Sequence, residues 1–231
     1  MATLIGEPAT RRVGASLETE IAGERVELLP EKAMYWPHER TLFVADLHLG
    51  KAAHFRAEAV PVPMGTTREN LARLARLLKR TDAERLVILG DLWHSQQALA
   101  PATLELVHAW RTKYSSLEAV LVMGNHDAKL DAIPKAFALR VEDEGVVMGP
   151  FELRHHPSDQ GTGAYRLAGH IHPSVTLEGK GRDSLRLPCF WFGESQGVLP
   201  AFGELTGTAR VHPRPSDRVF VVAGSRVMAV S

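Results

Sequence analysis

Histidine, aspartate and asparagine residues recur along this chain directly after short apolar runs. They are Asp46 and His48 after LFVA, Asp91 and His94 after LVILG, Asn125, His126 and Asp127 after VLVMG, His155 and His156 after FELR, and His170 and His172 after YRLAG. Apolar runs of this length are typical of buried strands. Because the ends of several strands converge on one crevice in an open α/β sheet, we expect a single cluster of His, Asp and Asn side chains.

Imidazole and carboxylate groups without thiolates suit divalent first-row metals such as Mn, Fe, Zn, Co or Ni. These candidates are too many for one ion, so we expect two ions that share one carboxylate. Two metal ions about 3.5 to 4 Å apart are the arrangement used for phosphoester displacement, where one ion clamps the phosphate and both acidify the attacking water. The pattern therefore predicts a dinuclear metal hydrolase that acts on phosphoesters.

Each fragment also has a purely structural interpretation. DLH or GNHD alone is more often a turn, because Asn, Asp and Gly favour turn conformations for local backbone reasons. All the fragments occur together, each at the end of an apolar run, and chance alone does not explain this combination. We therefore interpret the set as a site, while any one fragment keeps the turn as its alternative.

The composition indicates one neutral globular domain. A chain of 231 residues with 45% apolar residues can bury one sizeable core, so we expect a single domain over residues 1–231. Roughly the first 20 residues are expected to be loosely held. Lysine plus arginine and aspartate plus glutamate number 27 each, so there is no global basic field to attract nucleic acid. Any binding of DNA or RNA would have to be local.

Several classes of protein are excluded by simple features. The single cysteine, Cys189, rules out an intramolecular disulfide and a CxxC zinc site, and it fits a reducing compartment. The first residues lack the pattern of a secretory signal, and no apolar run approaches the roughly 18 residues that a membrane span needs. We expect a soluble, intracellular protein that does not enter a membrane.

The order of the expected elements favours an α/β fold. Strands and helices alternate in the first half, with strands at 24–30, 41–45, 85–90 and 118–124 and helices at 66–80 and 101–114. The spacing of Thr66 and Glu69 predicts a capping box at the first helix, and Pro101 can open the second. From Gly145 onward the chain has short strand candidates separated by turn residues. An α/β half followed by a β-rich half predicts two sheets packed together.

The metal-ligand pattern as a whole resembles a known family. The order Asp-x-His, Gly-Asp-x-x-His, Gly-Asn-His-Asp, His and Gly-His-x-His is similar to that of the calcineurin-like metallophosphoesterase superfamily, which implies a four-layer α/β/β/α sandwich of two mixed sheets. The segments VADLHLGK, PVPMGTT, LVILGDLWHS, GNHDAKL, RHHP, AGHIHP, LPCFWFG and VLPAFGELTG are further similar to the bacterial PdeM family of ligase-associated DNA damage response metallophosphoesterases. This similarity covers nearly the whole chain.

The resemblance distributes the ligands over two metal ions. One ion takes Asp46, His48, Asp91 and His172, and the other takes Asp91, Asn125, His155 and His170. Asp91 is the bridging carboxylate, and an anion between two dications offsets their mutual repulsion. His155 is preferred to His156 because it is the first residue after its strand.

The resemblance gives the remaining polar residues other roles. His126 would face the substrate, as proton donor to the leaving oxygen or as stabiliser of charge on the phosphoryl group. Asp127 would orient His126, and His94 would support the site in a similar way. Further substrate contacts are expected from residues on a loop or short helix beside the metals, namely Lys51, His54 and Arg56.

The PdeM resemblance implies a Mn-dependent phosphodiesterase or DNA endonuclease of the bacterial cytoplasm, working in repair beside a DNA ligase, an exonuclease-like protein and a helicase. The expected reaction is attack by a metal-bridging hydroxide, with inversion at phosphorus and no covalent intermediate. Because the chain lacks the added domains of larger nucleases, small or single-stranded diesters are alternative substrates. A phosphomonoesterase or nucleotide pyrophosphatase is the alternative enzyme. A metal-binding scaffold without catalysis is the alternative class, against which the proton donor His126 argues.

Overall fold

The computed structural model describes residues 16–62, 65–179 and 183–230. The expectation of a loosely held N-terminus falls mostly on residues 1–15, which lie outside the described residues, and from Leu17 onward the chain forms a strand. Within the described ranges, no helix combines the length and the apolar character that crossing a membrane requires.

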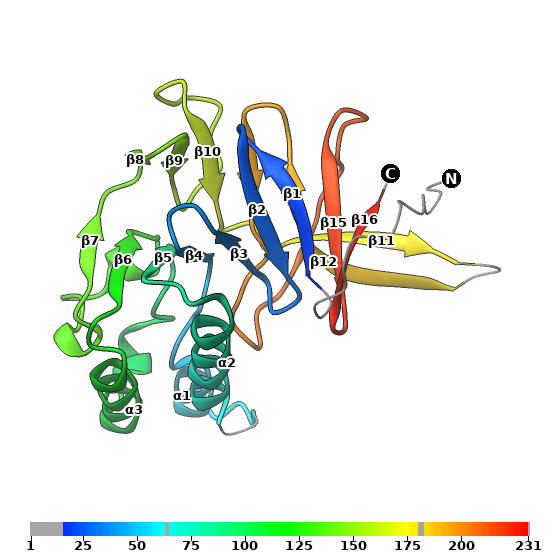
Figure 1. Ribbon diagram of the computed structural model, residues 1–231. Helices are drawn as coiled ribbons and strands as arrows, with labels where there is room; N and C mark the ends of the chain where they lie inside the picture. The colour runs from blue at the N-terminus through cyan, green and yellow to red at the C-terminus, as the bar shows by residue number, and fades with distance from the viewer. Residues whose placement is uncertain (1–15, 63–64, 180–182, 231) are drawn as a thin grey trace.

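The α/β half of the chain forms a seven-stranded mixed sheet (Figure 1). In both chain order and spatial order its strands are β1 (Leu17–Ile21), β2 (Glu24–Leu29), β3 (Ala33–Trp36), β4 (Thr41–Val44), β5 (Arg85–Leu89), β6 (Glu118–Val122) and β7 (Arg140–Glu142). Strands β1 to β4 pair in antiparallel fashion, whereas β4 to β7 are parallel. Because parallel strands run in one direction, β4, β5 and β6 end at the same edge of the sheet.

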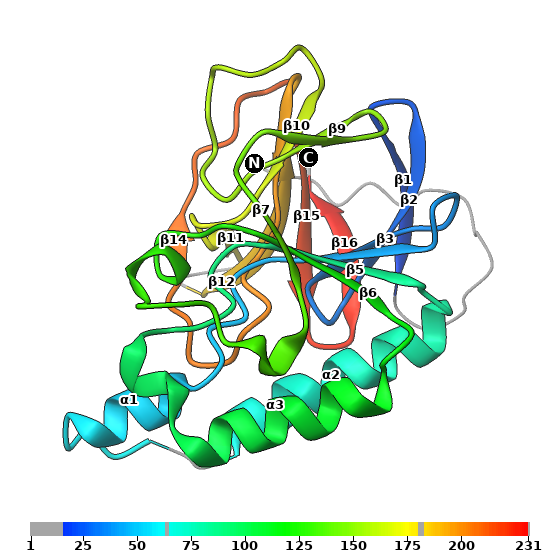
Figure 2. The same ribbon diagram turned by 90° about the vertical axis from the view of Figure 1, so that its left-hand side faces the viewer.

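The α-helices of the described residues lie in the crossover connections and cover one face of this sheet (Figure 2). They are α1 (Lys51–Ala57), α2 (Thr66–Thr81) and α3 (Pro101–Lys113), with short 3-10 turns at η1 (Gln96–Leu99), η2 (Asp127–Lys129) and η3 (Lys135–Phe137). The leucines of α2 at positions 71, 74, 77 and 78 are buried, as the helical period predicts.

The start of α2 differs from the expected capping box. Its N-cap is Gly65, in a left-handed conformation with φ of 97°, and no side chain caps the helix. Thr66 is therefore the first helical residue and is buried, so its hydroxyl does not occupy the capping position. The α3 start agrees with expectation, because Pro101 is at its first turn.

The β-rich half forms a nine-stranded mixed sheet. Its strands are β8 (Val146–Met148), β9 (Phe151–Leu153), β10 (Tyr165–Ala168), β11 (Pro173–Glu178), β12 (Ser184–Phe192), β13 (Gln196–Val198), β14 (Ala209–Arg210), β15 (Arg218–Ala223) and β16 (Arg226–Val230). The spatial order is β14-β11-β12-β13-β10-β9-β8, and the hairpin of β15 and β16 pairs with β12. Strand β10 is parallel to both of its neighbours, β9 and β13.

The two sheets share one apolar core. Phe43 of β4 faces the second sheet and lies edge-on to Phe151 of β9, with ring centroids 6.1 Å apart. The alternate residues Leu42 and Val44 face the helices instead. Strand β4 is therefore buried on both faces, which explains why its sequence is continuously apolar.

The expected α/β class and two mixed sheets are confirmed. The fourth layer of the expected sandwich is not found in the described part of the chain, since no α-helix follows α3 and all the helices cover the first sheet (Figures 1 and 2). The outer face of the second sheet instead carries a small apolar cluster around Cys189 and Val221. The physical reason is local, because the connections after β7 carry no apolar residues at helical period.

Candidate metal centre

The loops that follow β4, β5 and β10 hold polar residues in an unusual backbone conformation. Positive φ angles occur at Asp46 (54°), His48 (46°), Asp91 (51°), His170 (65°) and His172 (51°). A side chain in this left-handed region costs about 1 to 3 kcal/mol, and such residues cluster at functional sites. The surrounding structure must therefore hold these loops in place.

Backbone hydrogen bonds join the first two of these loops. The amide of Asp46 donates to the carbonyl of Gly90 at 3.2 Å, and the amide of His48 donates to the carbonyl of Asp91 at 2.9 Å. The pairing continues with a bond of 2.8 Å from Leu49 to the carbonyl of Leu92. The parallel ladder between β4 and β5 thus extends beyond the strand ends and sets the two loops side by side.

Glycines allow the loops to approach closely. A Cβ atom on Gly90 would lie 2.1 Å from His155 Nδ1, and one on Gly124 would lie 2.3 Å from the backbone nitrogen of Asp91. A Cβ atom on Gly169 would lie 2.7 Å from Asp46 Oδ2. Because these distances are below van der Waals contact, no larger residue fits at these positions without displacing the polar side chains.

One group of candidate ligands comprises Asp46, His48 and His172, whose ligand atoms lie within 4.8 Å of one another. His172 Nε2 lies 3.4 Å from Asp46 Oδ1. The other ring nitrogen of His172, Nδ1, donates to the carbonyl of Gly207 at 2.9 Å, so in the neutral ring Nε2 is the nitrogen that offers a lone pair. Among the described residues, Asp46 Oδ1 is buried without a hydrogen-bond partner.

A second group lies around His155, which is fully buried. His155 Nδ1 donates to the carbonyl of Leu89 at 3.0 Å, so in the neutral ring Nε2 is the nitrogen that offers a lone pair. That Nε2 lies 3.0 Å from Asn125 Oδ1, 3.1 Å from His170 Nδ1 and 3.5 Å from Asp91 Oδ2. Lone pairs that face one another in a buried place repel unless a cation lies among them. The donor set therefore fits divalent metal ions.

Three histidines of this cluster, His48, His94 and His170, are held in the neutral form that metal binding requires. Burial lowers the pKa of His48 to about 2 and that of His94 to about 3, and the positive charge of Lys51 acts in the same direction. Burial also lowers the pKa of His170, and the neighbouring His155 adds to this effect. Neutral imidazole offers its lone pair to a metal at physiological pH.

His126 lies at the edge of the cluster and has a different environment. Its Nδ1 donates to the backbone carbonyl of His94 at 2.6 Å, and its Nε2 lies 3.9 Å from Asp91 Oδ2. Its side chain is 32% exposed, whereas that of Asp91 is 3% exposed. The rings of His94 and His126 are stacked with centroids 5.0 Å apart, and His94 Nδ1 lies 3.4 Å from His48 Nδ1. His126 thus presents its free nitrogen to solvent beside the candidate ligands.

Asp127 does not hydrogen-bond the His126 ring that it was expected to orient. Its carboxylate accepts hydrogen bonds from the backbone amides of Leu92 at 3.2 Å, Trp93 at 3.0 Å and Gly124 at 3.3 Å. The side chain is 1% exposed, so its lone pairs need these donors. Burial raises the pKa of Asp127 to about 6, even though the three hydrogen bonds from backbone amides act in the opposite direction. Asp127 joins the loops after β5 and β6, and the His126 ring is oriented by the His94 carbonyl instead.

Glu144 is a residue of the site that sequence reasoning missed. Its Oε1 accepts hydrogen bonds from the backbone amides of His155 at 2.8 Å and His156 at 2.5 Å, and from His156 Nδ1 at 3.0 Å. Glu144 therefore fixes the loop after β9 and turns His156 toward itself. No periodic signal in the sequence marks Glu144, because only the pairing of β8 with β9 brings it to this loop.

The three expected substrate contacts lie on α1. Burial lowers the pKa of Lys51, while the charges of Asp91 and Asp46 oppose this effect, and its ammonium group lies 5.7 Å from the centroid of the Phe55 ring. His54 Nδ1 lies 3.1 Å from Ser95 Oγ, and the His54 ring centroid is 4.8 Å from that of His94. Arg56 is exposed in the last turn of the helix. The structure thus brings Lys51 and His54 to the centre, with Arg56 farther along the helix surface.

A family model and one solved structure agree with this fold. The family model described as calcineurin-like phosphoesterase matches residues 39–191. Among solved structures, the Pseudomonas putida nuclease MPE is 43% identical and is matched over 93% of this chain and 99% of its own, with a TM-score of 0.81. Yfce, a phosphoesterase from E. coli, is 16% identical over 83% of this chain and 97% of its own, with a TM-score of 0.39. No curated protein matches the chain.

Proposed function

Since the chain belongs to the calcineurin-like phosphoesterase family, we propose that this metal-dependent phosphoesterase is a dinuclear phosphodiesterase that acts on DNA. One observation carries the proposal. Asp91 Oδ2 lies 3.8 Å from His48 Nε2, 3.5 Å from His155 Nε2 and 3.9 Å from His126 Nε2. A single carboxylate oxygen therefore faces both groups of candidate ligands and the histidine that would donate a proton.

We assign Asp46, His48, Asp91 and His172 to one ion, and Asp91, Asn125, His155 and His170 to the other. The grouping of Asp46 with His48 and His172 supports the first set, as does the unpartnered Asp46 Oδ1, and the contacts of His155 with Asn125, His170 and Asp91 support the second. His155 is preferred to His156 because its free nitrogen points at Asn125 and Asp91, whereas His156 Nδ1 is bound to Glu144. Mn is the proposed metal, and the oxygen and imidazole donors also suit Fe, Zn, Co or Ni.

When bound, the two ions supply positive charge to the phosphoryl oxygens and acidify the attacking water. The chain's own contribution to leaving-group departure comes from His126. Because Nδ1 is held by the His94 carbonyl, the proton that moves is the one on Nε2. Loss of that proton to the leaving oxygen returns His126 to the neutral tautomer that this carbonyl binds.

Lys51 and His54 would contact the diester from the side of α1. A partly buried ammonium group near the ligands attracts the anionic phosphodiester, because low surrounding dielectric strengthens the interaction. His54 is placed next to His94 and Ser95, and Arg56 extends the positive charge along the helix. We propose these residues as substrate contacts.

The choice of a diester rests on the similarity to the nuclease MPE over nearly the full length of both chains. With the similarity of the motifs to the PdeM family, it supports a role in bacterial DNA repair, in the cytoplasm, beside a DNA ligase, an exonuclease-like protein and a helicase. The neutral net charge implies that contacts to DNA are concentrated at the site.

The experiment that tests this function compares substrates on Mn-loaded protein. Hydrolysis of bis(4-nitrophenyl) phosphate and of single-stranded, duplex and nicked DNA is measured beside that of 4-nitrophenyl phosphate. Faster hydrolysis of the diesters is expected. Preferential release of phosphate from the monoester would favour a phosphomonoesterase. Dinucleoside pyrophosphates are tested in the same way, and cleavage of these substrates alone would favour a pyrophosphatase. Metal binding without any hydrolysis would make the chain a scaffold.

A further inference from the structure

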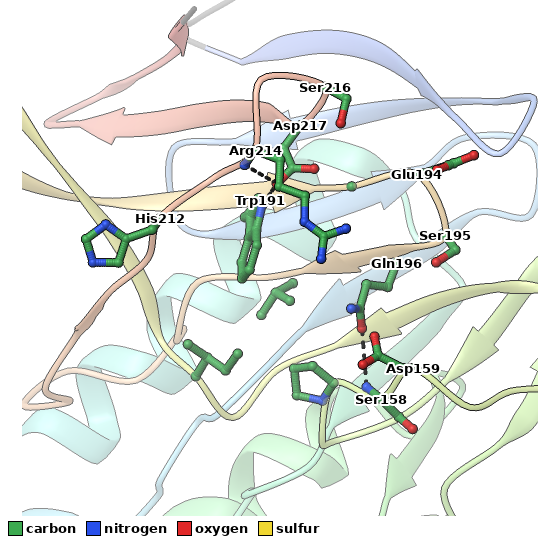
Figure 3. A pocket seen from close by; sticks show the side chains of 14 residues that line it. Ser158, Asp159, Trp191, Glu194, Ser195, Gln196, His212, Arg214, Ser216 and Asp217 are labelled. Atoms are coloured by element: carbon green, nitrogen blue, oxygen red, sulfur yellow. Dashed lines mark hydrogen bonds between the residues drawn. The ribbon is translucent and has the colours of Figure 1, made fainter.

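A cleft of about 480 Å³ opens on the second sheet (Figure 3), and its lining includes none of the proposed metal ligands. Its walls are residues 157–159, Ile171, Trp191 of β12, residues 193–196, Val198 and residues of the 212–217 segment. The volume falls within the range of about 300 to 1,000 Å³ that is usual for small-molecule sites. The cleft is thus large enough for one nucleoside.

The walls of the cleft continue from the loops that carry the proposed ligands. Pro157 directly follows His155 and His156, and Ile171 lies between His170 and His172. The segment just before the 212–217 wall forms two hydrogen bonds with His172. The carbonyl of Gly207 accepts from His172 Nδ1 at 2.9 Å, and the amide of Ala209 donates to the His172 carbonyl at 3.0 Å. A substrate held at the metals would therefore reach the cleft with the group attached to its phosphate.

Trp191 and Arg214 are fixed on one side of the cleft by a shared partner (Figure 3). Asp217 Oδ2 accepts hydrogen bonds of 2.8 Å from both the indole N–H of Trp191 and the backbone amide of Arg214. The Arg214 side chain is exposed and, among the described residues, forms no ion pair within 4.0 Å. An aromatic ring held in place and an unengaged guanidinium are both stacking partners for flat groups.

The charge of the lining selects the kind of ligand. Carboxylates at Asp159, Glu194 and Asp217 outnumber the one arginine, Arg214, so a phosphate group inside the cleft would be repelled. A nucleobase is uncharged, has a π-face for stacking and carries N–H groups that donate hydrogen bonds to carboxylates. The lining also offers Ser158 and Gln196 as hydrogen-bonding groups.

We propose that this cleft binds the nucleobase next to the scissile phosphate, with the base stacked on Trp191 and covered by Arg214. The inference rests on the proposed phosphodiesterase function and adds the residues that hold the substrate beyond the metals. Stacking of a base on an aromatic side chain is worth about 1 to 3 kcal/mol, which corresponds to about 5- to 150-fold in affinity.

A binding experiment on EDTA-treated protein tests the cleft without hydrolysis. The probe is a DNA trinucleotide with a central 2-aminopurine, whose fluorescence is quenched by stacking. We expect saturable quenching with the wild type and an affinity at least about fivefold weaker for Trp191→Leu and for Arg214→Ala. The matched controls are Trp191→Phe, which keeps a ring, and Arg226→Ala, which removes an exposed arginine at the start of β16. Both controls should bind more tightly than the cleft variants.

A kinetic experiment separates this inference from the proposed function. Methyl 4-nitrophenyl phosphate lacks a base, whereas the 5′- and 3′-(4-nitrophenyl) phosphates of thymidine carry one beside the same leaving group. We expect the cleft variants to raise KM for at least one thymidine ester by about fivefold or more and to leave the methyl ester unchanged. Equal binding and equal KM in wild type and both cleft variants would overturn the inference. Failure of the wild type to hydrolyse any diester, with quenching still sensitive to Trp191 and Arg214, would overturn the proposed function instead. Because Arg214 is exposed, its variant remains a test if Trp191→Leu fails to fold.

Discussion

The side chain of His126 is tied to the backbone of His94 by a hydrogen bond of 2.6 Å. A carbonyl oxygen only accepts, so Nδ1 carries the proton and Nε2 is the nitrogen that faces Asp91 and the candidate metal ligands. The loop after β5 therefore fixes the tautomer of a residue that follows β6. This relationship makes the role of His126 separable from that of the ligands.

Replacing His126 by alanine should preserve metal content and remove turnover. General acid catalysis contributes about 10² to 10⁴ in rate, so a loss of this size in kcat is expected on a diester with a poor leaving group. Metal content is measured by mass spectrometry after dialysis, beside the rate. His108→Ala, which removes an exposed histidine of α3, is the control. A wild-type rate in His126→Ala would remove this residue from the mechanism.

Metal binding should stabilise the fold, because the buried Asp46 Oδ1 has no partner among the described residues. A ligand that binds only the native state stabilises it by about 2.7 kcal/mol at 100 times its Kd. Titration of Mn should therefore raise Tm in the wild type and raise it far less in Asp46→Asn, whose amide keeps the shape and removes the charge. Without metal, Asp46→Asn should melt no lower than the wild type. The exposed Asp131→Asn is the control, and a Mn response equal to that of the wild type in Asp46→Asn would contradict the assignment.

The close approach of Gly90 to His155 gives a test of the second metal position. In Gly90→Ala the new Cβ would lie 2.1 Å from His155 Nδ1, so this ring must move and one ion should be lost. Gly163→Ala is a matched control, since both glycines have positive φ (79° and 96°) but nothing lies within 4 Å of a Cβ on Gly163. Both variants should lose about 1 to 2 kcal/mol for the backbone conformation. Retention of two ions per chain in Gly90→Ala would argue against His155 as a ligand.

Substitution of Asp127 should change the free energy of unfolding more than it changes the catalytic rate. Asp127→Ala leaves three backbone amides without their acceptor, and each buried unsatisfied donor costs about 1 to 3 kcal/mol, part of which water recovers. A loss of about 2 to 5 kcal/mol is expected in urea unfolding, with a smaller loss in Asp127→Asn, which keeps one acceptor oxygen. If Asp127→Ala were as stable as the wild type but inactive, Asp127 would have a role in the reaction itself.

The sequence was most informative where the pattern is local and repeated. The continuous apolar runs of β4, β5 and β6 predicted buried strands, and the polar residues after them do converge at one edge. The heptad-like leucines of α2 predicted its buried face. Such features follow from a few neighbouring residues and need no knowledge of distant contacts.

Features that depend on contacts across the fold were not predictable in this way. The partners of Asp127 lie on the neighbouring loop after β5, and Glu144 reaches His155 only because β8 and β9 form a hairpin. The cleft around Trp191 combines four distant segments of the chain. The expected outer helical layer came from resemblance alone, and the connections after β7 contain no helical pattern to build it.

The left-handed backbone at Asp46, His48, Asp91, His170 and His172 sets stability against function. Glycine would adopt these φ angles without strain, so at each position the residue that best relaxes the chain is one that cannot hold a metal. Selection for thermal stability alone would therefore favour glycine at these positions, and the metal ligands would be lost first. Because these residues adopt a strained conformation, the rest of the fold must supply the free energy of folding that they cost.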